Sequence, residues 1–238
     1  MRRLAFRTSP SEYDDAFMET MASQYLERTA WTQLRLGALH ELVEPAAGDR
    51  IVDLGCAAGA LTHFLSGFGA AAVGVDSEER AITKARSLFP ELEFRQADVA
   101  ELPFAEDSFD KAVAGDLVEH LGEETFRAML GELQRVLVPG GSLSIYTPNP
   151  LHPIERLKAR NLVLAQNPTH IGLRTSAELA EILRDCGFVV DRDSWRASFF
   201  PVLRRVEGVL GRHSHTFRYR VCLRARAVST VAPVTEQR

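Results

Sequence analysis

The chain has 238 residues, of which 45% are hydrophobic and 25% charged, and its formal net charge at pH 7 is −4. This is the composition of an ordinary globular protein, and it excludes collagen-like, coiled-coil and wholly disordered architectures. No apolar run approaches the ~20 residues of a membrane-spanning helix, and no apolar stretch follows the basic residues at 1–7. We therefore expect a cytoplasmic protein without stable membrane insertion. The net negative charge argues against a general nucleic-acid binder.

Charge is distributed unevenly along the chain. Residues 196–238 carry nine arginines and only two glutamates. A block of this kind usually forms a solvated surface, here the face of a strand, and contact with an anionic partner is the alternative. The three cysteines have neither metal-ligand nor disulfide spacing, so we expect them to be small buried apolar residues.

Two helices are predicted before residue 45. Ser9 begins a capping box, and apolar residues repeat on one face of the helix that follows it. A second helix is predicted over 29–43, with one apolar side formed by Trp31, Leu34, Ala38 and Leu42. We expect residues 1–44 to form an N-terminal helical cap.

Strands and helices alternate from residue 45 onward. Short apolar runs predict strands at 51–54, 72–75, 92–96, 111–115, 142–147, from 189 and at 219–227. Ser77 is expected to cap the helix after the second strand, and Thr175 begins the capping box of a later helix. The clearest helix between strands has the apolar face Phe126, Met129, Leu130, Leu133 and Leu137. This alternation predicts an α/β fold whose parallel sheet binds ligands outside the carboxyl ends of its strands.

Three of the expected strand ends carry acidic residues. Asp53 precedes a glycine turn, where its carboxylate would repel the pyrophosphate of a dinucleotide and attract a sulfonium or ammonium group. Asp76 is placed to accept hydrogen bonds from both hydroxyls of a ribose. Asp98 can accept a hydrogen bond from an exocyclic amine, and the Val99 amide can donate one to a ring nitrogen. Together these loops predict an adenosine site with an acid at each end.

With these loops in this order, the sequence resembles the class I methyltransferases that use S-adenosylmethionine. The resemblance covers about residues 45–195 and is closest to small-molecule methyltransferases of the ubiquinone-biosynthesis type. It is carried by VDLGCAAG at 52–59, VGVD at 73–76, QAD at 96–98, SFDKAVAGDLVEHL at 108–121 and LVPGG at 137–141. It implies a Rossmann-like, doubly wound, seven-stranded and mostly parallel sheet with one antiparallel strand, N-terminal helices and a lid.

On the same basis, residues 45–228 form the methyltransferase domain, with a lid at 148–174, an insertion at 199–215 and a frayed tail at 229–238. The implied cofactor is S-adenosyl-L-methionine. The residues implied to bind it are Asp53, Gly55, Cys56, Gly59, Asp76, Ser77, Asp98, Val99 and Asp116. The first loop would hold the methionine end, Asp76 the ribose, residues 98–99 the adenine, and Asp116 would lie near the transferred methyl. The family usually has glycine where this chain has Ala57, whose methyl group narrows the loop.

Methyl transfer to a hydroxyl or an amine also requires the removal of one proton, and a general base adds roughly 10²–10⁴-fold to such a rate. His120, after the fourth strand, and His170, in the lid, are the candidate catalytic residues. Structural hydrogen bonding is the alternative role for each. His152, in a proline-rich turn, is a third candidate. We predict no metal site, because no cluster of Asp, Asn and His follows the fourth strand.

An acceptor chamber is predicted between the N-terminal helices and the lid. Its aromatic contributors would be Tyr13, Phe17, Tyr25 and Trp31. The amphipathic stretch 199–210 would be a cap on this chamber, a dimer contact or a surface that touches lipid. An apolar chamber suits a hydrophobic acceptor such as a polyketide, a quinone precursor or a lipid-linked compound.

We therefore expect an enzyme that transfers a methyl group from S-adenosylmethionine to a small organic acceptor, in the first instance at oxygen. Its partner would be this acceptor and no nucleic acid, and a homodimer is left open. Three alternatives stay open. The basic C-terminal end favours an RNA- or protein-modifying methyltransferase. A nicotinamide-dependent oxidoreductase is opposed by Asp53 and by the incomplete Gly-x-Gly-x-x-Gly pattern. A non-catalytic cofactor-binding protein would carry the same cofactor residues.

Overall fold

The computed structural model describes residues 20, 23–160, 162 and 167–228. The helix predicted after Ser9 and the tail predicted at 229–238 lie outside these residues. The helix predicted over 29–43 is present as α2 (Ala30–Val43), and the side chain of Thr29 accepts a hydrogen bond from the Thr32 amide at its N-cap. The described residues contain no helix with both the length and the apolar character needed to cross a membrane.

The described strands form one sheet in the order β3-β2-β1-β4-β5-β7-β6. Their bounds are β1 (Arg50–Leu54), β2 (Ala71–Asp76), β3 (Glu93–Gln96), β4 (Phe109–Gly115), β5 (Leu137–Pro148), β6 (Phe188–Arg196) and β7 (Arg220–Ala227). The β1, β2, β3, β4 and β5 pairings are parallel, and β7 runs antiparallel to both β5 and β6. The predicted seven-stranded, doubly wound sheet with one antiparallel strand is confirmed.

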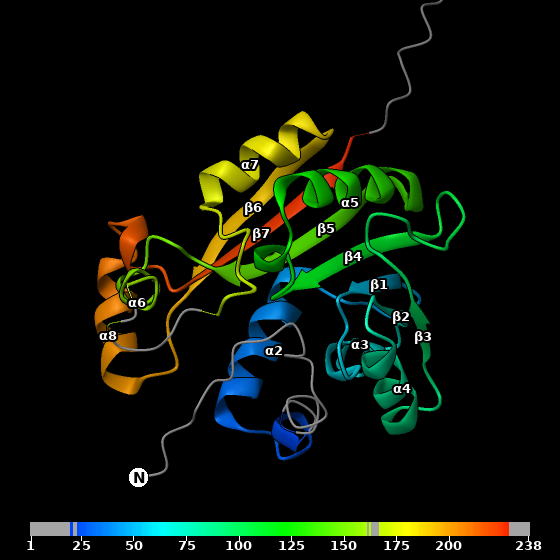
Figure 1. The fold of residues 1–238 in the computed structure, drawn as a ribbon, viewed down its shortest axis with the longest axis horizontal. Helices are drawn as coiled ribbons and strands as arrows, with labels where there is room; N and C mark the ends of the chain where they lie inside the picture. The colour runs from blue at the N-terminus through cyan, green and yellow to red at the C-terminus, as the bar shows by residue number, and fades with distance from the viewer. Residues whose placement is uncertain (1–19, 21–22, 161, 163–166, 229–238) are drawn as a thin grey trace, which may run out of the picture.

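Helices cover both faces of this sheet (Figure 1). On one face lie α5 (Glu123–Val136) and α7 (Ser176–Asp185), and on the other lie α2, α3 (Ala60–Ser66) and α4 (Glu79–Leu88). The remaining helices are η1 (Val118–His120), α6 (Pro153–Lys158), α8 (Pro201–Leu210) and η2 (His215–Phe217).

Alternation along the strands divides the core in two. In β1, Val52 and Leu54 pack with the α5 and α7 side chains, whereas Ile51 packs with α2 and α3. Because side chains of a strand point alternately to opposite faces, Asp53 points to the α2 and α3 side. Its carboxylate is therefore buried beneath two helices although it stands at a strand end.

Helix α5 shows how the sequence positions one of these layers. The predicted face of Phe126, Met129, Leu130 and Leu133 is completely buried, which is the outcome expected of apolar residues at helical spacing. Leu137, predicted to lie on the same apolar face of this helix, instead begins β5. The capping box of α7 is confirmed, with Thr175 and Glu178 exchanging both hydrogen bonds.

Two local predictions were wrong. Leu34 of α2 is 39% exposed, and the buried side of that helix passes through Leu36 and Leu39 instead. Ser77 does not cap α4, because the N-cap is Glu78. The Asp76 side chain already accepts a hydrogen bond from the Glu78 amide, so the start of the helix is fixed from the preceding strand.

Candidate cofactor and acceptor site

The loop between β1 and α3 is shaped by backbone that only glycine adopts easily. Gly55 and Gly59 have φ angles of +68° and +82°, in the left-handed region. A Cβ on Gly55 would lie 2.8 Å from Leu117 Cδ1, and one on Gly59 would lie 2.7 Å from the Phe94 ring. Both glycines are therefore required by conformation, and at Gly59 packing against Phe94 requires glycine as well.

Ala57 lies in the same loop with a φ of +47°, which an alanine adopts only at a cost of roughly 1–2 kcal/mol. We expect Ala57→Gly to raise the free energy of unfolding by about 0.5–1 kcal/mol, since the relief of strain exceeds the added unfolded-state entropy of glycine. Urea unfolding at constant m-value measures this. Ala58→Gly, at a neighbouring position without a positive φ, is the matched control and should lose stability. A loss of stability in Ala57→Gly would contradict the assignment of strain.

Asp76 connects the ends of β1 and β2. Its Oδ2 accepts a hydrogen bond from the Ala57 amide at 2.9 Å, and its Oδ1 accepts one from the Glu78 amide at 3.0 Å. Burial raises the pKa of Asp76, and these backbone hydrogen bonds oppose the rise. A carboxylate has about four acceptor positions. Each oxygen of Asp76 therefore keeps capacity for a ligand hydroxyl.

Asp53 lies on the other side of the loop and is 1% exposed. Its Oδ2 accepts a hydrogen bond from the Thr62 hydroxyl at 2.7 Å. Burial raises the pKa of Asp53 to about 7, although the Thr62 hydrogen bond and the charge of Arg35 oppose the shift. A carboxyl group in this setting is stabilised in its charged form by an added cation.

The other predicted cofactor residues lie along the same edge of the sheet. The Cys56 amide donates to the Val75 carbonyl at 2.9 Å, and the Ser77 carbonyl accepts from the Gln96 side chain at 3.1 Å. Asp98 is exposed and its Oδ1 accepts from the Ala100 amide at 2.9 Å, the turn geometry typical of aspartate. The Val99 side chain is buried in the core, so only its backbone can face a ligand.

Asp116 follows β4 in a left-handed conformation, with a φ of +60°. Both of its oxygens are paired with arginines: Oδ2 lies 2.7 Å from Arg35 Nε, and Oδ1 lies 3.2 Å from Arg220 Nη1. Arg35 also donates to the Gly115 carbonyl at 3.0 Å. Burial alone would raise the pKa of Asp116, but the charges of Arg220 and Arg35 outweigh it and lower the pKa. Asp116 therefore stays ionised.

Sequence reasoning missed both arginines. Arg35 is a charged residue in an otherwise apolar region of α2. This position was the sequence feature that could have indicated a buried ion pair. Arg220 was assigned to the solvated face of the last strand, and for this residue that prediction was wrong: its side chain is 12% exposed, and its guanidinium lies over the rings of Tyr146 and Tyr219. Arg224 and Arg226 of the same strand do pair with a surface acid, Asp191.

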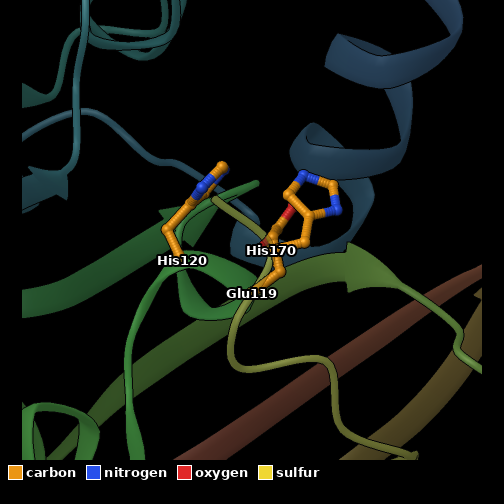
Figure 2. Close-up of side chains that lie close together, drawn as sticks. All are labelled: Glu119, His120 and His170. Carbon is orange, nitrogen blue, oxygen red and sulfur yellow. The ribbon is translucent and has the colours of Figure 1, made fainter. Parts of the chain in front are cut away.

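The two candidate catalytic histidines lie together (Figure 2). The rings of His120 and His170 are 4.8 Å apart between centroids and nearly perpendicular. Glu119 lies beside them, and its Oε2 accepts a hydrogen bond from the Thr147 hydroxyl at 2.9 Å. Burial lowers the pKa of His120 and lowers that of His170 to about 4, and it raises the pKa of Glu119 to about 8. Both imidazoles are therefore neutral at pH 7.

The segment 167–175 places His170 in this cluster. The Gly172 amide donates to the Glu119 carbonyl at 2.8 Å, and Arg174 donates to the Val118 and Leu121 carbonyls at 3.1 and 3.0 Å. A Cβ on Gly172 would lie 2.0 Å from the Leu121 oxygen, so this close approach requires glycine. Part of the predicted lid is thus bound directly to η1, at the carboxyl end of β4.

His152 lies apart from this cluster and has a structural role. It is the N-cap of α6, where its Nδ1 accepts from the Ile154 amide at 3.3 Å. Its Nε2 lies 3.0 Å from Glu207 Oε1, and both side chains are buried. This contact ties α8 to α6. Four apolar side chains of α8 are exposed, namely Val202, Val206, Val209 and Leu210. Whether α8 acts as a cap, a dimer contact or a lipid surface stays a prediction.

Of the predicted chamber residues, Tyr13 and Phe17 lie outside the described residues. Tyr25 bonds the His63 ring through its hydroxyl at 2.7 Å and packs edge-on against Phe89. Tyr25 therefore packs on α3 and on the end of α4, and its ring and its hydroxyl are both engaged in these contacts.

The donor set around the first loop fits one kind of ligand. A buried carboxyl group that is stabilised by a cation lies on one side of a left-handed glycine turn, and a carboxylate with open acceptor positions for a diol lies on the other. S-Adenosylmethionine has this combination of a cationic end and a ribose. Together with the strand order, this arrangement is the one expected of a class I S-adenosylmethionine-dependent methyltransferase domain.

Comparison with known proteins agrees with this class. Residues 51–141 match a family model described as a methyltransferase domain. The chain is 29% identical over 165 residues to a "Probable S-adenosylmethionine-dependent methyltransferase" of Mycolicibacterium smegmatis, across 69% of this chain and 62% of that protein. It is 37% identical over 124 residues to the mitochondrial ubiquinone biosynthesis O-methyltransferase of Mus musculus, across 49% of this chain and 33% of that protein. Over the matched residues the chain contains a methyltransferase domain and is similar to S-adenosylmethionine-dependent methyltransferases, and it spans less than two thirds of the length of these relatives.

A solved structure is similar in fold over more of the chain than the residues 51–141 that match the family model. A Haloferax volcanii protein in complex with the Trm112 methyltransferase activator superposes with a TM-score of 0.68, at 20% identity, over 94% of this chain and 100% of that chain. At this identity the similarity concerns the fold alone. The Rossmann-like fold and the family resemblance predicted from the sequence are confirmed.

Proposed function

We propose that the protein transfers the methyl group of S-adenosylmethionine to an oxygen atom of a small organic acceptor. When bound, this cofactor supplies a methyl group already activated by a positively charged sulfur. The observation that carries the proposal is the convergence of two sets of residues at one end of the sheet. The cofactor acids Asp53 and Asp76 end β1 and β2, and the cluster of Glu119, His120 and His170 follows β4.

The residues of the chain have distinct tasks in this proposal. The glycine loop and Asp53 would hold the cationic methionine end, and Asp76 the ribose. The ion pairs of Asp116 with Arg35 and Arg220 fix the end of β4 between the two sets. Positioning of the two reactants supplies most of the acceleration in such a reaction. The cluster would hold the acceptor hydroxyl and assist loss of its proton.

Oxygen is favoured as the attacking atom by two observations. The residues beside the proposed acceptor position are neutral imidazoles and a carboxyl group, which suit a hydroxyl whose proton must leave. A relative that matches 49% of the chain is named as an O-methyltransferase. The basic residues of β7 favour an RNA or protein substrate as the second candidate, but two of them are already paired with Asp191.

The test uses S-adenosylmethionine with a labelled methyl group, incubated with the protein and with cell extract separated into small-molecule, RNA and protein fractions. We expect label in the small-molecule fraction, on an oxygen that mass spectrometry identifies. Label in RNA or protein alone would overturn the acceptor assignment. Tight cofactor binding without transfer to any fraction would favour a non-catalytic role.

Asp53 makes cofactor affinity depend on pH. A cationic ligand binds the ionised form, and the pKa of Asp53 in the free protein is raised to about 7. Below that pH a proton must leave on binding, so we expect affinity to fall by up to about tenfold per pH unit and to level off above pH ~7. Calorimetric titration between about pH 5.5 and 7.5 measures this. Asp53→Asn should bind more weakly with no such slope, and an equal slope in that variant would contradict the assignment.

A further inference from the structure

Glu119, His120 and His170 present three metal-ligating atoms at one place. One ligand atom from each side chain lies within 4.8 Å of the others. Glu119 and His120 come from η1, and His170 comes from the segment 167–175 that is bonded to η1 (Figure 2). The three groups are brought together by tertiary structure, which is why the sequence predicted no metal here.

Neighbouring side chains orient two of these groups as metal ligands are oriented. The Thr169 hydroxyl donates to Asn167 Oδ1 at 2.8 Å, so its oxygen is left to accept from His120 Nδ1 at 2.9 Å. The proton of His120 is thereby placed on Nδ1, and the lone pair on Nε2. The Thr147 hydroxyl likewise holds Glu119 Oε2. Histidine ligands of metals characteristically donate their other ring N–H to such a partner, which fixes the tautomer.

The donor set indicates the kind of ion. Two imidazoles and one carboxylate form the protein ligands of catalytic zinc sites that keep a position open, and imidazole also suits other first-row transition metals. Bonds of about 2.0–2.2 Å place ligand atoms of one ion closer together than 4.8 Å, so the cluster must contract by on the order of 1 Å. Glu119 is buried, and the two histidines are half-buried.

We propose that Glu119, His120 and His170 bind one divalent transition-metal ion, and that the hydroxyl oxygen of the methyl acceptor takes an open position on it. The second half rests on the proposed function. A metal ion lowers the pKa of an oxygen bound to it. The hydroxyl proton is released to solvent, the carbon–sulfur bond of the cofactor breaks, and a carbon–oxygen bond forms. The products are a methyl ether, S-adenosylhomocysteine and one proton, with no oxidation or reduction. The acceptor class is therefore a phenol or another acidic hydroxyl compound.

The experiment uses the full chain without a polyhistidine tag, freed of metal by a chelator. Zn²⁺ is titrated calorimetrically, and Co²⁺ by its visible absorption, which reports the coordination. We expect one equivalent to bind, and His170→Ala and Glu119→Gln to weaken binding at least tenfold. Thr169→Val, which removes only the partner of His120, should weaken it about tenfold. His213→Ala, at an exposed histidine elsewhere, is the matched control and should bind as the unchanged protein does.

Circular dichroism and thermal unfolding show that each variant is folded. Binding that is absent, or equal in the unchanged protein, His170→Ala and Thr169→Val, would overturn the site. Cofactor binding and methyl transfer are measured on the same metal-free protein. Transfer at full rate without metal would overturn the site and leave the proposed function intact. Metal binding lost in the variants, with no methyl transfer to any hydroxyl compound, would support the site and contradict the proposed function.

Discussion

Replacing Asp76 with alanine is expected to weaken binding of S-adenosylmethionine by about 100-fold or more. Two charge-assisted hydrogen bonds to the ribose hydroxyls would be lost, each worth about 1.5–3 kcal/mol, and tenfold in affinity corresponds to about 1.4 kcal/mol. The change also leaves the Ala57 and Glu78 amides without their present acceptor. Without these hydrogen bonds the loop after β1 would no longer be held in the conformation that the proposed cofactor site requires.

Calorimetric titration measures this loss of affinity, and urea unfolding shows how much of it reflects loss of structure. Asp76→Asn keeps the size of the side chain but turns one oxygen into a donor that faces a backbone amide, so it should also bind poorly. Glu78→Ala is the control. The Glu78 side chain is adjacent to Asp76 but exposed, and it makes no capping hydrogen bond. Affinity in Asp76→Ala equal to that of Glu78→Ala would remove Asp76 from the cofactor site.

Replacing Arg35 with methionine is expected to lower the free energy of unfolding by about 2–3 kcal/mol. Removal of one partner of a buried ion pair costs about 3–5 kcal/mol when the other charge is left alone. Here the cost is smaller, because Arg220 still lies beside Asp116, whose side chain is 24% exposed. Methionine retains much of the apolar stem, so the loss reports the guanidinium and its bonds to Asp116 and Gly115.

A double-mutant cycle with Asp116→Asn separates the pair from its surroundings. We expect the two changes together to destabilise the protein by less than the sum of the single changes, with a coupling of about 1–3 kcal/mol. Arg127→Met supplies the comparison, since its pair with Glu123 is solvent-exposed and such pairs contribute at most about 1 kcal/mol. Additive effects of the changes at 35 and 116 would contradict a direct ion pair.

The sequence by itself determined the sheet, its core and the loops at the carboxyl ends of the strands. Each of these rests on residues close together in the chain: apolar runs for the strands, helical spacing in α5, and glycines and acids at strand ends. Asp53 and Asp76 were identifiable because parallel strands end at the same edge of a sheet, so position along the strand fixed position in the site. The same logic failed for Leu34, since which side of a helix is buried depends on what it packs against.

Tertiary structure alone decided which residues meet beside Asp116 and in the cluster of Glu119, His120 and His170. Arg35 reaches Asp116 from a helix on the face of the sheet, and Arg220 reaches it from the antiparallel strand, so no spacing in the sequence relates the three. His170 meets Glu119 because the Gly172 amide and the Arg174 side chain bind the carbonyls of η1. Contacts of this kind join residues that only chain packing makes neighbours, and their geometry follows from the completed fold and not from local preference.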